Sequence, residues 1–162
     1  MSATTGVATT VEPAPTRDDI GARCPAAATP ATRSGLHQQA PFDVSAVPPY
    51  AFVTSSGLAT CVVRPGTGSE NPTIGDRVEV HYAGWSTDGT IFEASEPRGQ
   101  TATFSLRAVI PGWTEGLGLM VEGEVRRLWV PEPLAYAGHP GRPAGMLVFD
   151  IELVRIIRAA AP

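Results

Sequence analysis

The sequence predicts an α+β fold in which a curled antiparallel β-sheet of about five or six strands wraps around one short α-helix. Three patterns predict this fold. Apolar and polar side chains alternate over residues 77–85, helical spacing is found over residues 112–120, and a long strand pattern over residues 146–156 gathers large apolar side chains on one face. An antiparallel sheet with one apolar face can bury that face by curling around the helix.

Four strands are expected before the helix, at residues 57–64, 77–85, 90–93 and 101–106. The first is enriched in Val and Thr and ends at the turn cluster of residues 65–68. In the second, Val78, Val80 and Tyr82 alternate with polar side chains, which is the pattern of a half-buried strand. Asp88-Gly89 favours the positive φ angles of a tight hairpin turn, so the second and third strands should pair.

The helix and two long strands complete the set. Pro111 is favoured in a first helical turn, and residues 112–120 follow it with Trp113, Leu117 and Met120 on one face. The two strands are expected at residues 124–130 and 146–156. The second of them places Leu147, Phe149, Ile151 and Leu153 on one face and Asp150 and Glu152 on the other.

Three regions follow one another along the 162 residues. Residues 1–41 are rich in Ala, Thr and Pro and almost lack large apolar side chains, so we expect a disordered leader. Residues 42–55 carry several such side chains between prolines, and we expect an extended arm over the folded domain of residues 56–158. Cys24 and Cys61 belong to no metal or redox motif, so no role is assigned to either, and Cys61 is expected to be a small buried apolar residue.

Charge and hydropathy argue against two classes of partner. With 12 basic and 16 acidic residues the net charge is −4, and no basic stripe is present to bind the phosphates of nucleic acid. No apolar run approaches the ~20 residues that a membrane span needs. The N-terminus lacks the basic start and apolar stretch of a signal peptide, so we expect a cytoplasmic protein, with an exported form whose signal has been removed as the open alternative. We also expect a monomer.

No metal or cofactor site is expected. His37, His81 and His139 are too scattered for ligand spacing, and the sequence has neither a glycine-rich phosphate loop nor the elbow of a nucleophilic serine. The core sequence instead brings aromatic residues together at one end of the sheet. An apolar pocket of this kind suits a reaction that needs no nucleophile.

Four segments carry a resemblance to a known family. They are Val80-His81-Tyr82, Val109-Ile110-Pro111-Gly112-Trp113, Leu134-Ala135-Tyr136 and Leu147-Val148-Phe149-Asp150. In their order and approximate spacing they resemble the signature of FKBP-type peptidyl-prolyl cis-trans isomerases, over about residues 56–157. The resemblance implies an enzyme without a cofactor that accelerates rotation about Xaa-Pro bonds in proline-containing polypeptides and so assists protein folding.

The chemistry of that reaction fits an apolar pocket. Rotation about an Xaa-Pro bond is slow because amide resonance gives a barrier of ~18–20 kcal/mol. The planar ground state carries more charge separation than the twisted transition state, so a pocket that excludes water favours the twisted form. Catalysis would then be differential binding of the two forms.

The resemblance assigns roles to ten residues. As catalytic residues it implies Tyr82, Glu93, Ile110 and Tyr136, and as substrate-binding residues Phe92, Arg98, Val109, Trp113, His139 and Phe149. Trp113 would form the floor under the prolyl ring, the Ile110 N–H and the Tyr136 hydroxyl would donate to substrate carbonyls, and the remaining aromatic residues would form walls. Glu93 stands where the family usually has an aspartate held by an arginine, which Arg98 matches.

Three departures from the family pattern leave a second function open. Glu93 carries one more methylene than aspartate, Ala102 stands where many members have an aromatic wall, and the loop of residues 137–145 is shorter than usual. We therefore expect weak catalysis and weak binding of macrolide inhibitors such as rapamycin. The alternative is a non-catalytic or weakly catalytic FKBP-fold module that binds extended peptide as a chaperone would.

Overall fold

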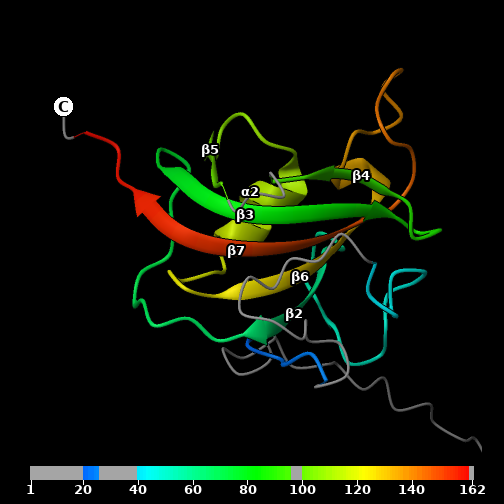
Figure 1. Cartoon of the computed structure of the whole chain (residues 1–162), viewed down its shortest axis with the longest axis horizontal. Helices are drawn as coiled ribbons and strands as arrows, with labels where there is room; N and C mark the ends of the chain where they lie inside the picture. Colours follow the sequence, from blue (N-terminus) through cyan, green and yellow to red (C-terminus); the bar gives the residue numbers. More distant parts are fainter. Residues whose placement is uncertain (1–19, 26–39, 96–99, 161–162) are drawn as a thin grey trace, which may run out of the picture.

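The computed structural model describes residues 20–25, 40–95 and 100–160, and its architecture is the predicted α+β fold (Figure 1). The strands are β1 (Phe52–Val53), β2 (Ala59–Arg64), β3 (Arg77–Ser86), β4 (Ile91–Ala94), β5 (Ala102–Ser105), β6 (Val125–Val130) and β7 (Leu147–Ile157). The helix α2 spans Pro111–Leu117, and a 3₁₀ turn, η2, spans Glu132–Leu134. The expected strands are therefore present within one or two residues of their predicted bounds, and β1 is added from the arm.

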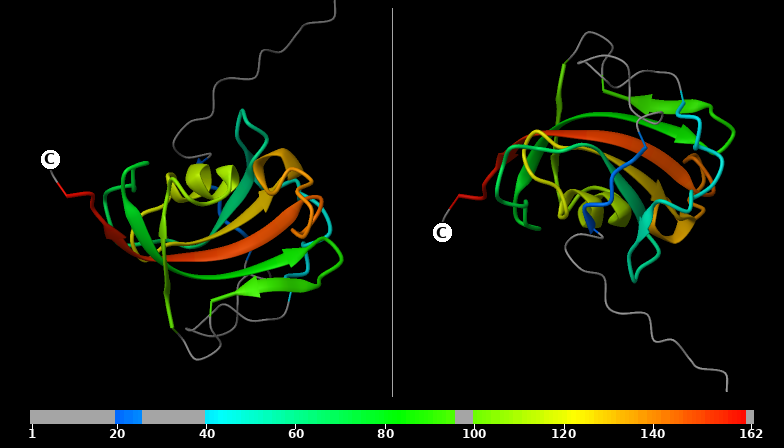
Figure 2. Two further views of the ribbon diagram at one scale, coloured as in Figure 1. Left: turned by 90° about the horizontal axis from the view of Figure 1, so that it is seen from above. Right: turned by 90° about the horizontal axis from the view of Figure 1, so that it is seen from below.

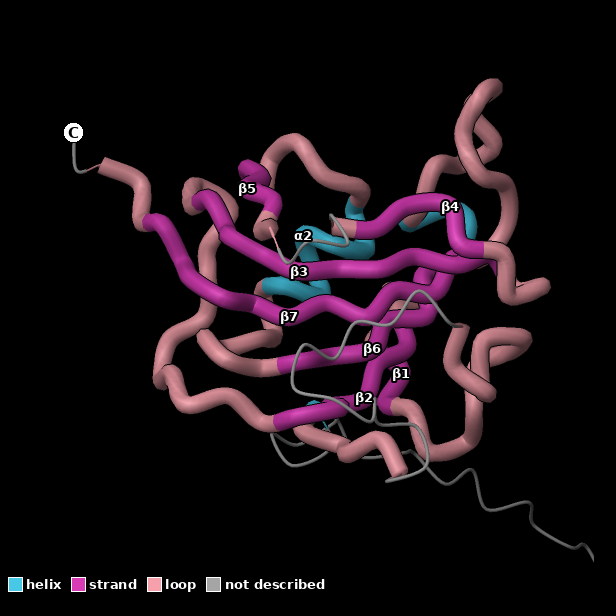
Figure 3. The backbone as a smooth tube through the Cα atoms, viewed as in Figure 1, coloured by secondary structure: helices cyan, strands magenta, loops and turns pink. Residues whose placement is uncertain are grey.

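The strands form one seven-stranded sheet in the order β1-β2-β6-β7-β3-β4, with β5 paired to β3 beside β4 (Figure 3). Each of these pairings is antiparallel. The long strands β3 and β7 pair along their whole length, from Arg77 opposite Ile157 to Ser86 opposite Leu147. They form the centre of the sheet and carry residues that the site needs.

The sheet curls around α2, which lies against its concave face (Figure 2). Two glycines let the helix come close to β6. A Cβ atom on Gly112 would lie 2.4 Å from Val130 Cγ1, and one on Gly116 would lie 2.6 Å from Leu128 Cδ1. The helix ends at Leu117, three residues earlier than predicted, although Met120 is still fully buried.

The concave face and the helix enclose the main hydrophobic core. Its buried members are Leu58, Val78, Val80, Tyr82, Leu106, Trp113, Leu117, Met120, Leu128, Val130, Ala135, Leu147, Phe149, Ile151 and Leu153. The four apolar residues predicted to share one face of β7 all belong to this core. The period of two in the sequence therefore identified the correct face.

The convex face of the sheet is also buried, in part by the arm that was expected to lie over the domain. A second cluster contains Cys24, Val44, Ala59, Cys61, Val63, Ala83, Trp85, Val125, Trp129 and Val148. Tyr50 and Ala51 from the arm pack against it, and so does Ala40, which precedes the arm. The expected arm thus covers one face of the sheet and turns its strands into a layer that is buried on both sides.

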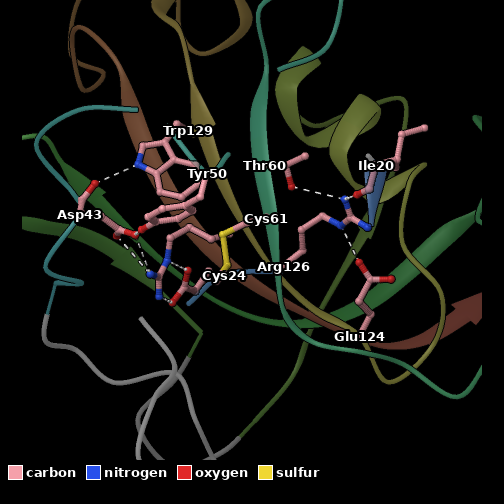
Figure 4. Close-up of a disulfide and its surroundings, with 11 residues drawn as sticks. Ile20, Cys24, Asp43, Tyr50, Thr60, Cys61, Glu124, Arg126 and Trp129 are labelled. Carbon is pink, nitrogen blue, oxygen red and sulfur yellow. Dashed lines mark hydrogen bonds and ion pairs between the residues drawn. A yellow bond between two sulfur atoms is a disulfide. The ribbon is translucent and has the colours of Figure 1, made fainter. Parts of the chain in front are cut away.

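Cys61 is buried as expected, but the sequence predicted neither its disulfide with Cys24 nor an ordered segment around Cys24. Cys24 and Cys61 form a disulfide across 37 residues, with their Cα atoms 5.1 Å apart (Figure 4). The backbone on both sides of Arg23 pairs in parallel with Val62, through bonds of 2.8 Å from Cys24 N–H to Val62 O and from Val62 N–H to Ala22 O. Residues 20–25 are therefore bound to β2, and Ala40 at the end of the expected leader packs against the same face, whereas residues 1–19 and 26–39 lie outside the described residues.

Charged side chains fix the arm to the convex face (Figure 4). Arg127 donates to both oxygens of Asp150, at 2.6 and 2.7 Å, and to Asp43 of the arm at 3.1 Å. All three side chains are buried. Tyr50 donates its hydroxyl hydrogen to Asp43, and the Trp129 indole donates to the Asp43 carbonyl at 3.0 Å. Asp43 is thus the residue through which the arm is held.

Candidate active site

A cavity of about 270 Å³ opens between α2, the concave face of the sheet and the loop after η2. It is lined by Tyr82, Glu93, Phe104, Ala108, Val109, Ile110, Trp113, Tyr136, Arg142 and Phe149. Seven of the ten residues that the resemblance assigned to a site are in this set. The cavity is large enough for a prolyl ring and its flanking peptide groups, and the protein's own side chains leave it open.

Aromatic rings in edge-to-face contact form the floor and walls. The Trp113 ring lies 5.0 Å from that of Tyr82, 5.5 Å from that of Phe104 and 5.4 Å from that of Phe149, with interplanar angles of 83°, 90° and 84°. Such contacts hold each ring in one orientation. The Trp113 indole N–H is buried and has no hydrogen-bond partner among the described residues. The floor of the cavity is therefore formed by aromatic rings held against one another.

Two hydrogen-bond donors at the cavity are unused within the described part of the chain. Ile110 precedes the helix, and its carbonyl accepts from the N–H groups of Trp113 and Thr114, while its own N–H has no acceptor there. The Tyr136 hydroxyl likewise has no partner among those residues. Burial and the nearby Glu93 charge raise its pKa, so the hydroxyl keeps its hydrogen. Both groups can donate to a ligand at neutral pH.

Glu93 accepts a hydrogen bond from Tyr82. Tyr82 donates its hydroxyl hydrogen to Glu93 Oε1 at 2.9 Å, and burial together with this bond raises the Tyr82 pKa above its ordinary value. Arg98, the expected partner of Glu93, lies outside the described residues. Tyr82 therefore orients the carboxylate, which lies at the exposed end of the cavity.

Two expected site residues do not line the cavity. Phe92 packs edge-to-face on Phe149, with ring centroids 5.6 Å apart, and so supports a wall from behind. His139 is exposed in the loop after Tyr136, and only its backbone is engaged, with the N–H donating to the Tyr136 carbonyl at 2.9 Å. Gly84 makes room for the two phenylalanines, because a Cβ atom there would lie 2.8 Å from each ring.

Three lining residues were missed from the sequence: Phe104, Ala108 and Arg142. Phe104 provides an aromatic wall on β5, the strand where Ala102 had suggested an open side, and its ring lies 5.8 Å from that of Tyr82. The alternation of residues 102–105 could have indicated this side chain. Arg142 follows a glycine in a turn-rich loop, which gives no sequence signal for a pocket residue.

The cavity offers binding and desolvation. Within the described residues, no group of three or more His, Cys, Asp or Glu side chains could hold a metal ion. In the same part of the chain, no helix has the length and apolarity that crossing a bilayer requires. The arrangement can enclose a small apolar ring on Trp113 and donate hydrogen bonds to two carbonyls beside it.

Comparisons with known proteins agree with this geometry. The profile of the FKBP-type peptidyl-prolyl cis-trans isomerase family matches residues 68–154. The chain is 49% identical over 111 residues to FkpA of Aeromonas hydrophila, which is 67% of this chain and 41% of that protein. Across the first curated relatives the chain spans about two fifths to three fifths of their length.

Solved structures show the same fold. The crystal structure of FkpA from Escherichia coli superposes with a TM-score of 0.63 at 43% identity, covering 68% of this chain and 53% of that one. A peptidyl-prolyl cis-trans isomerase from Pseudomonas syringae superposes with a TM-score of 0.62 at 36% identity, covering 70% of this chain and 86% of that one.

Proposed function

The chain belongs to the FKBP-type peptidyl-prolyl cis-trans isomerase family, and from that premise we propose that it accelerates rotation about Xaa-Pro bonds in polypeptide substrates and so assists their folding. The observation that carries the proposal is the open aromatic cavity with two unused donors, the Ile110 N–H and the Tyr136 hydroxyl.

The proposed mechanism is differential binding. The prolyl ring would lie on Trp113, where the apolar walls remove water from the imide and so favour the less polar, twisted form. The Ile110 N–H would donate to one substrate carbonyl and the Tyr136 hydroxyl to a neighbouring peptide oxygen. Phe149 and Val109 would confine the ring, and Glu93, oriented by Tyr82, would lie beside the rotating carbonyl. Each ~1.4 kcal/mol of preference for the twisted form gives a tenfold rate increase.

The test is exchange NMR on a short Xaa-Pro peptide with and without the full chain. We expect faster cis/trans exchange with the wild type and a clear loss with Phe149→Leu, which retains an apolar side chain in the core. Tyr50→Phe, on the convex face, serves as the control and should keep the wild-type rate. Peptide binding without faster exchange would favour the alternative of a binding module, and unchanged exchange at saturating protein would contradict the enzyme.

The compartment proposed from the structure differs from the cytoplasm expected from the sequence. Disulfides form and persist in oxidising compartments and are rare in the cytosol. The Cys24–Cys61 disulfide therefore supports residence in an oxidising compartment. Alkylation of the protein isolated from its source without reduction should modify neither cysteine. Two alkylated thiols would return the assignment to the cytoplasm.

Three further proposals concern the domain organisation, the oligomeric state and the binding of inhibitors. We propose that residues 56–158 are the isomerase domain, that residues 42–55 are its structural arm, and that the protein is a monomer. Macrolide inhibitors such as rapamycin should bind weakly, because the short loop of residues 137–145 gives little cover to the cavity. Light scattering of the full chain tests the monomer, and inhibitor titration tests the weak binding.

A further inference from the structure

Arg142 brings a positive charge to the rim of the cavity. It lies in the loop of residues 137–145, lines the cavity, and places its guanidinium 5.4 Å from the centre of the Tyr136 ring. Its backbone N–H donates to the His139 carbonyl at 3.3 Å, which keeps this part of the loop turned toward Tyr136. A guanidinium stacked on an aromatic face is held in place while its N–H groups stay free to donate.

The charge of Arg142 is available to a ligand. Its guanidinium makes no hydrogen bond or ion pair with any residue that the structure describes, and the side chain is exposed. Glu93, the acidic residue at the same cavity, instead accepts the hydrogen bond from Tyr82. Both charges act on the Tyr136 hydroxyl. Burial raises its pKa, Glu93 raises it further and Arg142 lowers it.

We propose that Arg142 is a specificity-determining residue that favours substrates with a carboxylate side chain directly next to the proline. This inference rests on the proposed function, because it assumes that the Tyr136 hydroxyl holds a peptide oxygen beside the prolyl ring. Since Arg142 stacks on the same tyrosine, its guanidinium lies beside the residue that flanks the proline. Its fork of N–H donors matches the two oxygens of a carboxylate.

The test compares peptides that differ only in charge next to proline. One series has Glu, Gln or Lys immediately before proline, and a second has the same residues immediately after it. Exchange NMR gives kcat/KM and titration gives Kd for the full chain. We expect Glu to be preferred over Gln by about two- to fivefold in one of the two series, the range for an exposed charge pair. Lys should be the poorest of the three residues.

Variants at Arg142 separate specificity from structure. The Glu to Gln ratio should fall to about one in Arg142→Ala, invert in Arg142→Glu and largely survive in Arg142→Lys. A purely structural role of Arg142 would instead lower all three peptides equally, which would overturn the proposal. Arg77→Ala is the matched control, because Arg77 is exposed at the start of β3 and does not line the cavity. It should keep the wild-type ratio.

The two readouts distinguish the failure of this inference from failure of the proposed function. A Glu to Gln ratio near one in both series of the wild type, for kcat/KM and for Kd, would overturn the role of Arg142 even if exchange is fast. A ratio in Kd that disappears in Arg142→Ala would support that role even if exchange is not accelerated. In that second case the isomerase would be rejected and the charge preference would belong to a peptide-binding module.

Discussion

The two faces of the sheet are both buried but are built from different interactions. On the concave face, aromatic and aliphatic side chains pack with α2 and leave an open cavity. On the convex face, a disulfide and a buried group of charged side chains hold two segments that come from the N-terminal part of the chain. Strands β3 and β7 contribute to both faces through alternate residues.

The concave face is therefore suited to binding a ligand, and the convex face to holding the N-terminal segments in place. Apolar rings can leave a space for a ligand at little cost, because no charge is left without its partner when the space is empty. The charged group on the convex face has no such freedom, since each charge there needs its partner once water is excluded. Changes on the convex face should therefore alter stability, and changes at the cavity rim should alter activity.

The largest effect is expected for Arg127→Ala. It would leave the Asp43 and Asp150 carboxylates buried without their shared partner, and breaking a buried pair in this way costs about 3–5 kcal/mol of unfolding free energy. Denaturant unfolding measures it. Arg155→Ala, which removes an exposed ion pair of 3.1 Å with Glu79, is the control and should cost about 0–1 kcal/mol.

If Arg127→Ala lowered the free energy of unfolding as little as Arg155→Ala, the convex face would not depend on its buried charges, and the proposed difference between the two faces would be wrong. Should Arg127→Ala fail to fold, Tyr50→Phe removes a single hydrogen bond to Asp43 and gives a milder test. It should still lower the free energy of unfolding, by about 1 kcal/mol.

Removal of the disulfide should have the next largest effect. Cross-linking across 37 residues restricts the unfolded chain, so the double change Cys24→Ala with Cys61→Ala should cost about 2–4 kcal/mol. The exchange rate of an Xaa-Pro peptide below the unfolding transition should not change. A reducing agent should destabilise the wild type by a similar amount and leave the double variant unaffected. Loss of activity in the folded double variant would show that the two faces are coupled.

Gly84→Ala should lower both stability and activity, because Gly84 packs against two rings of the concave face. The added methyl group would meet the rings of Phe92 and Phe149 at 2.8 Å, and overpacking of this kind costs about 1–3 kcal/mol. Because Phe149 lines the cavity, exchange should slow as well. Gly75→Ala is the control, since its Cβ atom would meet only Ala159, at 3.8 Å. An unchanged exchange rate in Gly84→Ala would mean that Phe149 is not part of the working site.

Tyr136→Phe should change activity with the least change in stability. It removes a hydroxyl that bonds to no described residue, so unfolding should shift by no more than about 0.5 kcal/mol. Loss of one neutral hydrogen bond to the substrate should lower kcat/KM about two- to tenfold. Unfolding and exchange NMR on the same sample give both numbers. A large loss of stability with full activity would show that the Tyr136 hydroxyl stabilises the fold and does not bind the substrate.

The concave face was predictable because its signals are local and periodic. Alternation along β3 and β7 identified the strands and the correct apolar face of each. Met120 explains the one wrong boundary: it is fully buried and lies at helical spacing from Trp113, but the chain leaves the helix at Leu117 and reaches the core through a turn. A buried residue after the helix thus had the same sequence spacing as a residue within it.

An arm over the domain was expected, but the disulfide and ion pairs that hold the convex face escaped prediction because they link distant residues. Cys24 lies in a stretch without large apolar neighbours, and only the even number of cysteines pointed to Cys61. Asp43 and Asp150 read as surface carboxylates until Arg127 is seen between them. At the cavity, Arg142 was missed for the opposite reason, since an arginine in a loop normally lies in solvent and only the Tyr136 ring holds it near the site.

The pairing of residues 20–25 with β2 has a consequence for self-association. A strand at the margin of a sheet presents N–H and C=O groups that can recruit an extended chain and start aggregation. Here Val62 already has both backbone groups bonded to the docked segment, and β1 covers Ala59 and Thr60. A protein proposed to handle unfolded polypeptides thus has this edge of β2 covered, and the covalent link at Cys24 keeps that cover in place.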